Sequence, residues 1–149
     1  MNSMIAVPLE TERLRLERLS TKFCTSTYVS WMNDPEVIKY LDSGGDYTLE
    51  KLEDFLKGVE SKDMLFWAIV DKGLDKHIGN IKIDPFSIMH HRGEYGILIG
   101  DKTAWGKGYA KEASIEVINY CFKNLNMKKV TLGASTKAGL VFLLVSEST

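Results

Sequence analysis

The sequence has 149 residues, which is enough for one domain with a substantial hydrophobic core and too few for two comfortable ones. Its hydrophobic fraction of 44% and charged fraction of 26% are ordinary for a globular domain, and a net charge of −1 gives no field that attracts nucleic acid or an anionic membrane. The two cysteines have no metal-ligand spacing, no apolar run can cross a bilayer, and no signal peptide is evident, so we expect a single cytoplasmic domain over residues 1–149 with no metal.

The first half of the chain predicts one strand followed by three helices. Leucines alternate with charged residues in the strand, whereas serine, threonine and proline residues mark favoured helix starts. The last of these helices also carries an apolar stripe at helical spacing. The predicted elements are a strand from Glu12 to Leu19, a helix from Ser20 or Thr21 to Asn33, a short helix from Asp34-Pro35 to Leu41, and a helix after Thr48 that extends to Val59.

In the second half the pattern changes to short runs rich in aromatic and β-branched residues, which favour strands. Asp84-Pro85 is expected to end the second of these runs, and a loop follows it. The predicted elements are the strands Leu65–Val70, Ile78–Ile83 and Glu94–Ile99, the loop Phe86–Arg92, the helix Ala110–Leu125 and the strand Lys128–Ala134. This order predicts an α+β or mixed α/β domain.

The most informative arrangement is the strand Glu94–Ile99, a glycine-rich loop, and the long helix after it. The loop has the sequence Trp105-Gly106-Lys107-Gly108-Tyr109-Ala110. Glycines let a backbone approach a ligand closely, and the free N–H groups and dipole of a helix N-terminus favour phosphate. An ordinary turn with two glycines is the alternative. Lys107 lacks the following Ser or Thr of a nucleotide-binding P-loop, and no dinucleotide-binding GxGxxG pattern occurs.

Three segments carry a further signal: Thr11–Leu16, Trp31–Val37, and Gly93–Asp101 continued by Trp105–Ala113. Together they resemble the Gcn5-related N-acetyltransferases, the GNAT family, over about Thr11 to Ser135. The resemblance is nearest to the branch that contains ribosomal-protein N-terminal acetyltransferases and related amino-sugar and small-amine enzymes. It implies a GNAT-like fold with helices on both faces of a mixed sheet, in which the two parallel strands Glu94–Ile99 and Lys128–Ala134 splay apart.

The resemblance also implies where acetyl-CoA binds. The pantetheine arm would pair with the backbone of the splayed strand, and loop amides would hold the pyrophosphate. Lys102 and Lys107 could neutralise phosphate charge, although a solvated surface lysine is the favoured alternative for Lys102. The implied cofactor-binding residues are Ile97, Leu98, Ile99, Trp105, Gly106, Lys107, Gly108, Tyr109 and Ala110.

Acetyl transfer from the thioester to an amine needs a base for the amine proton and a donor for the carbonyl oxygen. Glu94 is the expected base, acting directly or through water, because partial burial would raise its pKa towards neutrality. A surface ion pair is the alternative role for this carboxylate. His90 and His91 are the other candidates, because an unperturbed histidine titrates near neutrality, but they are expected to be exposed loop residues.

From about residue 136 the chain departs from the family pattern, and its end resembles a truncated or frame-shifted one. The apolar run Gly139–Val145 is expected to pack across the last strand or to form a homodimer with a second copy. The predicted function is acetyl transfer from acetyl-CoA to a primary amine: a protein N-terminus, an amino sugar or a small amine. A non-catalytic acyl-CoA-binding or interaction module is the alternative, and a phosphate-loop nucleotide binder is a distant third.

Overall fold

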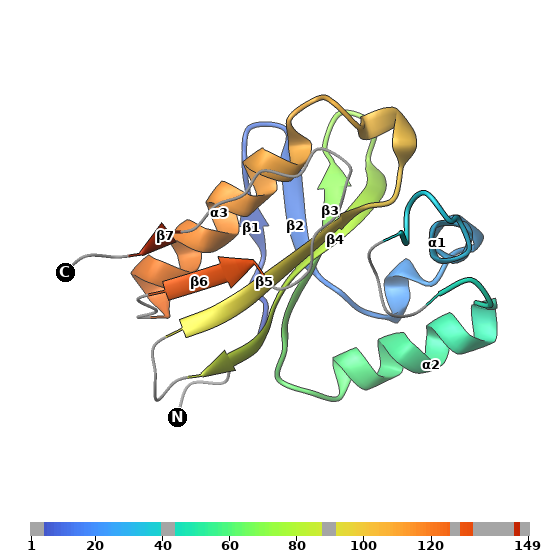
Figure 1. The fold of residues 1–149 in the computed structure, drawn as a ribbon, viewed down its shortest axis with the longest axis horizontal. Helices are drawn as coiled ribbons and strands as arrows, with labels where there is room; N and C mark the ends of the chain where they lie inside the picture. Colours follow the sequence, from blue (N-terminus) through green and yellow to red (C-terminus); the bar gives the residue numbers. More distant parts are fainter. Residues whose placement is uncertain (1–4, 40–43, 88–91, 126–128, 133–144, 147–149) are drawn as a thin grey trace.

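The structure is a computed structural model that describes residues 5–39, 44–87, 92–125, 129–132 and 145–146. A mixed sheet forms its centre, and three α-helices pack on the two faces of that sheet (Figure 1). The elements are β1 Leu9–Glu10, β2 Leu14–Arg18, α1 Ser26–Met32, α2 Leu49–Glu60, β3 Leu65–Asp71, β4 Lys76–Ser87, β5 Arg92–Ile99, α3 Tyr109–Asn124, β6 Lys129–Leu132 and β7 Val145–Ser146, with 3-10 turns η1 Thr21–Phe23 and η2 Lys102–Ala104.

The seven strands lie in the sheet in the same order as in the sequence. Neighbouring strands are antiparallel except β5 and β6, which run parallel and are joined through α3. A parallel pair needs such a crossover because its two strands must start at the same end of the sheet. The predicted α+β architecture with a parallel pair is therefore confirmed.

Two hydrophobic clusters fill the two faces of the sheet. The first lies between the sheet and α3, where Trp67, Ile97 and Val117 are buried. The second lies under α1 and α2 and includes Trp31 and Leu56. The strand β5 serves both, because Ile97 and Ile99 pack in the first cluster while Leu98 packs against the second, as strand alternation requires. The prediction of helices on both faces is confirmed (Figure 1).

The helix predicted from Ser20 to Asn33 is wrong as a continuous element. Ser20 does cap a turn, since its side chain accepts a hydrogen bond from the Lys22 backbone, but only the short η1 follows. The chain then takes extended backbone at Cys24 and Thr25, and the Thr25 side chain caps α1 separately. Two competing caps within five residues thus divide the predicted helix, because each favours its own start.

The short helix predicted after Asp34-Pro35 is also wrong, since residues 35–39 form turns. The Asp34 side chain accepts a hydrogen bond from the Glu36 backbone at 2.9 Å, which favours a turn over helix propagation. Nearby, the Asn33 side chain exchanges two hydrogen bonds with the Tyr47 backbone, at 2.7 and 3.0 Å, and closes the segment between α1 and α2. The remaining predicted residues, 40–41, lie outside the described part.

The expected end of a strand at Asp84-Pro85 is wrong as well, because β4 continues to Ser87. The register between β4 and β5 shifts between Ile83 and Phe86, so Pro85 lies in an irregular part of the ladder. Proline lacks an N–H and is tolerated in a sheet at such a place. The predicted loop Phe86–Arg92 is correspondingly shorter, and residues 88–91 lie outside the described part.

The structure tests little of what was predicted for the carboxy-terminal apolar run. Val145 and Ser146 form β7, which pairs antiparallel with β6 of the same chain. Residues 133–144, which include most of the predicted apolar tail, lie outside the described residues. The expected homodimer through this tail therefore has no support in the structure.

One half-buried histidine lies under α1. The imidazole of His77 has its ring centroid 4.8 Å from those of Phe23 and Trp31, and its Nε2 lies 2.9 Å from Asn80 Oδ1. Burial lowers the pKa of His77 below its usual value, because the charged ring would lose its hydration. The neutral imidazole is therefore the form that this cluster favours.

This burial predicts a pH dependence of stability. The unfolded state takes up the His77 proton at about pH 6.5 while the folded state resists it, so the free energy of unfolding should fall as the pH drops below about 6.5. Urea unfolding of the wild type and of His77→Gln at about pH 7.5 and about pH 5.5 should show a smaller loss in the variant. An equal loss in both proteins would contradict the assignment to His77.

Candidate functional site

The amino terminus of α3 has no side-chain cap, and it follows two glycines with positive φ angles. Gly106 and Gly108 have φ angles of +77° and +81°, which glycine adopts without penalty. Gly108 is the N-cap and no side chain caps the helix, whose first backbone hydrogen bond runs from the Glu112 N–H to the Gly108 carbonyl. The N–H groups of the first turn are thus available to an anion.

The loop before α3 is anchored by its tryptophan. Trp105 Nε1 donates a hydrogen bond to the Ile99 carbonyl at 2.8 Å, which ties the loop to the end of β5. The half-buried Trp105 ring packs against both hydrophobic clusters. Residues Gly106 to Gly108, in contrast, are exposed, and a Cβ built on Gly106 would meet nothing within 4 Å. A rigid base therefore presents an open glycine turn, and this donor set fits a pyrophosphate.

Within the described residues, the parallel pairing with β6 covers only the first half of β5. β5 and β6 pair from Arg92–Lys129 to Tyr95–Leu132, whereas β5 itself continues to Ile99. Over Gly96 to Ile99, the described part of the structure pairs β5 only with β4 on its other side. This half of β5 can offer backbone hydrogen bonds to an extended ligand, as the predicted splay requires.

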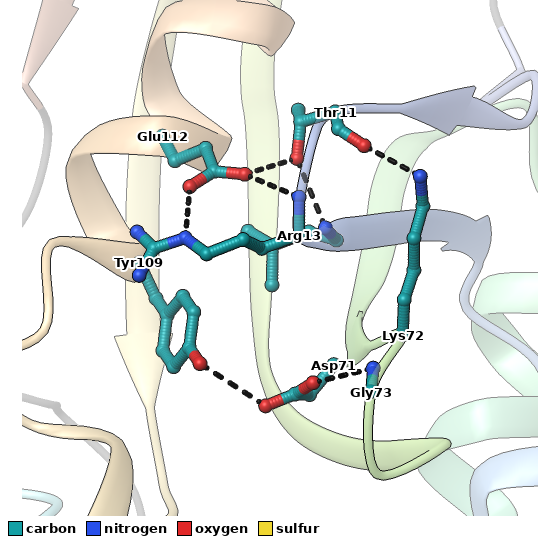
Figure 2. Close-up of polar contacts among 8 residues, drawn as sticks. Thr11, Arg13, Asp71, Lys72, Gly73, Tyr109 and Glu112 are labelled. Atoms are coloured by element: carbon teal, nitrogen blue, oxygen red, sulfur yellow. Dashed lines mark hydrogen bonds and ion pairs between the residues drawn. The ribbon is translucent and has the colours of Figure 1, made fainter.

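A polar network joins the first turn of α3 to the start of β2 (Figure 2). The Glu112 carboxylate accepts hydrogen bonds from the Thr11 hydroxyl at 2.5 Å, from the Arg13 backbone at 2.9 Å and from Arg13 Nε at 2.7 Å. Burial alone would raise the pKa of Glu112, but the hydrogen bonds from Thr11 and Arg13 hold it below its usual value. Glu112 is therefore an ionised anchor for Arg13.

Tyr109, the first residue of α3, is held from two sides. Its hydroxyl donates to Asp71 Oδ2 at 3.2 Å, and the Arg13 guanidinium carbon lies 4.3 Å from its ring centroid. Asp71 in turn accepts the Gly73 backbone N–H in the β3–β4 turn at 2.8 Å. The start of α3 is thus fixed to the end of β3 as well as to β2 (Figure 2).

The two lysines considered for phosphate have different surroundings. Lys102 Nζ lies 2.8 Å from both Asp34 and Glu36, and these carboxylates raise its pKa. Lys102 thereby connects the turn after α1 to η2, a role that neither sequence alternative foresaw. Lys107 is exposed between Gly106 and Gly108 in the glycine turn.

The candidate base lies in β5. The backbone of Glu94 pairs with Thr131 of β6, one residue before the last paired position. Its side chain lies outside the described part of the structure, as do His90 and His91. The assignment of Glu94 as base therefore stays a prediction.

Sequence reasoning missed the network around Arg13. Thr11 and Arg13 are about a hundred positions from Glu112, and such a separation leaves no periodic pattern. One signal did exist, since Arg13 and Glu112 both lie in segments quoted for the family resemblance.

Within the described residues, no helix is both long and apolar enough to cross a membrane. The same part of the chain holds no group of three or more His, Cys, Asp or Glu side chains arranged to bind a metal ion.

Comparison with known proteins gives consistent matches. The family model described as "Acetyltransferase (GNAT) domain" matches residues 13–138. The N-acetyltransferase p20 of Bacillus licheniformis is 29% identical over 126 residues, which are 82% of this chain and 70% of that protein.

Two solved structures share the fold. Spermidine N-acetyltransferase from Vibrio cholerae, in complex with CoA and spermine, superposes with a TM-score of 0.70 at 20% identity, over 82% of this chain and 71% of that one. Ribosomal-protein-S5-alanine acetyltransferase from Vibrio fischeri superposes with a TM-score of 0.70 at 19% identity, over 83% of this chain and 72% of that one.

Proposed function

The chain belongs to the GNAT acetyltransferase family, and from this premise we propose that it transfers an acetyl group from acetyl-CoA to a primary amine. As a member of this family it is an acyltransferase, and acetyl-CoA is its co-substrate. The observation that carries the proposal is the juxtaposition of two features: the half-strand Gly96 to Ile99, which among the described residues pairs only with β4, and the uncapped N-terminus of α3.

Each part of this arrangement has a role in the proposal. The backbone of Ile97, Leu98 and Ile99 pairs with the pantetheine arm, since among the described residues β6 pairs with β5 only as far as Tyr95. The N–H groups of the glycine turn and of Tyr109 and Ala110 bind the pyrophosphate, because they combine free donors with the positive end of the helix dipole. Trp105 keeps the turn against β5, and the exposed Lys107 adds positive charge.

The chemistry then requires little more of the protein. Acetyl-CoA supplies the activated acetyl group. Glu94 accepts the proton of the acceptor amine, directly or through water, and a backbone N–H of the Ile97–Ile99 region polarises the thioester carbonyl. Glu94 lies two residues before Gly96, where the half of β5 that β6 does not pair within the described residues begins. This position supports the role, because in the proposal the acyl end of the pantetheine arm lies at the start of that half.

A primary amine as acceptor agrees with the names of the similar proteins. The fold neighbours act on spermidine in one case and on a ribosomal protein in another. We propose the same acceptor classes here: a small amine, an amino sugar or a protein N-terminus. We further propose a single domain over residues 1–149 that acts in the cytoplasm.

Release of free thiol from acetyl-CoA tests the proposal. The purified chain is incubated with acetyl-CoA and a panel containing polyamines, amino sugars and peptides with free N-termini, and each rate is compared with that without acceptor. We expect at least one amine to stimulate thiol release and to gain an acetyl group by mass spectrometry. Binding of CoA without turnover on any amine would instead favour a non-catalytic acyl-CoA-binding module. Absence of CoA binding would contradict both functions.

A further inference from the structure

The guanidinium of Arg13 is held rigidly beside the glycine turn. Its Nε donates to Glu112 Oε1 at 2.7 Å, and its face lies over the Tyr109 ring at 4.3 Å. Figure 2 shows the group between the Glu112 carboxylate and the Tyr109 ring. Its orientation is therefore set by two residues of the first turn of α3.

The two Nη atoms of this guanidinium have N–H groups available for a ligand. Arginine has five N–H donors, and Glu112 uses the one on Nε. For the four donors on the Nη atoms, the described residues provide no hydrogen-bond acceptor. One of these atoms, Nη2, lies 3.6 Å from where a Cβ would stand on Gly108, the N-cap of α3. The free donors thus lie at the helix end that holds the other anion donors.

We propose that Arg13 is a further phosphate-binding residue of this acyltransferase, whose Nη donors bind a pyrophosphate oxygen of acetyl-CoA at the N-terminus of α3. This inference rests on the proposed function, which places the pyrophosphate at this helix end. A planar guanidinium binds phosphate by paired, charge-assisted hydrogen bonds, which a lysine at the same place would not form.

Glu112 explains why a carboxylate is present in a phosphate site. It lies in the first turn of α3, where an isolated negative charge would repel the ligand. Three hydrogen bonds, two of them from Arg13, satisfy this carboxylate. Glu112 therefore acts as a positioning residue, because it fixes the guanidinium through Nε and leaves the Nη atoms for the ligand.

Binding of three related probes tests the proposal. CoA carries the pyrophosphate and a 3′-phosphate, 3′-dephospho-CoA carries the pyrophosphate alone, and pantetheine carries no phosphate. Dissociation constants are measured by calorimetry for the wild type, Arg13→Gln and Arg13→Lys. Arg15→Gln is the matched control, since Arg15 lies two residues along the chain and binds Glu17 and Asp75 at 3.2 and 2.5 Å. Melting temperatures without ligand report on the fold of each variant.

We expect Arg13→Gln to weaken CoA and 3′-dephospho-CoA by about tenfold each, with pantetheine unchanged. Arg13→Lys should recover part of this loss, and Arg15→Gln should change each dissociation constant less than about twofold. Unchanged CoA binding by Arg13→Gln would overturn the inference. An equal loss for pantetheine would show a merely structural role, and a loss for CoA alone would move the contact to the 3′-phosphate. If the wild type fails to bind CoA, the proposed function itself is wrong.

Discussion

Replacing Glu94 by glutamine should lower kcat by about a hundredfold or more while leaving the dissociation constant for CoA unchanged. Glutamine keeps the size of the side chain but cannot accept the proton of the attacking amine. The backbone of β5, which we expect to hold the pantetheine arm, is unaltered by this substitution. The rate is measured with the best acceptor of the amine panel, and CoA binding is measured by calorimetry on the same preparation.

A control separates this effect from a general loss of negative charge. Glu50 is an exposed residue of α2 that belongs to no part of the proposed site, and Glu50→Gln should retain the wild-type kcat. If Glu94→Gln retains more than about a tenth of the wild-type kcat, Glu94 is not the base. If it loses CoA binding together with activity, its role is in the cofactor site.

Gly100→Ala should lower the free energy of unfolding by about 1–3 kcal/mol. A Cβ on Gly100 would stand 2.0 Å from Cδ2 and 2.4 Å from Cγ of Trp31, far inside contact distance. The backbone cannot easily move away, because the Gly100 N–H donates to the Ile78 carbonyl at 2.9 Å. The methyl group must therefore push the indole of α1 out of its packed position. Urea unfolding at neutral pH measures the change.

A glycine-to-alanine substitution in α2 should change the free energy of unfolding in the opposite direction. Gly58 lies within α2, and a Cβ there would meet nothing within 4 Å. Alanine favours a helix interior over glycine by about 0.5–1 kcal/mol, so Gly58→Ala should raise the free energy of unfolding. Similar changes in the two variants would contradict the packing explanation for Gly100.

The elements that could be predicted from the sequence are those whose local signals agree. α3 and the glycine turn before it combine an apolar face, an open helix start and two residues with positive φ, and all of these lie within a short stretch. α2 was equally predictable, because Thr48 caps it and its buried leucines follow helical spacing. The parallel pairing of β5 with β6, in contrast, was expected from the family resemblance.

The errors arose where local signals compete or where partners lie far apart. Thr25 begins α1 at a place where Ser20 had already offered a cap, and Pro85 is accommodated by a shift of register that only the neighbouring strand reveals. Lys102 is bound by Asp34 and Glu36, residues of a distant turn. Such contacts depend on the tertiary fold, so no short-range pattern encodes them.

In the candidate site, too, features with a local sequence signal could be predicted and contacts between distant residues could not. The glycine turn was predictable because glycine and helix starts are local features. The anchoring of Arg13 by Glu112 was not, since it joins β2 to α3 across about a hundred residues. The geometry of the proposed phosphate site thus depends on the residues at the start of β2 as much as on the loop itself.

The position of Trp105 makes its intrinsic fluorescence a probe of the glycine turn. Of the three tryptophans, Trp31 and Trp67 are buried, whereas Trp105 is half-buried and joins the glycine turn to β5. A quencher dissolved in water therefore reaches this indole in preference to the other two. Its emission reports on the neighbourhood of the turn without any label, so we expect that filling of the proposed phosphate site can be followed in the unmodified chain.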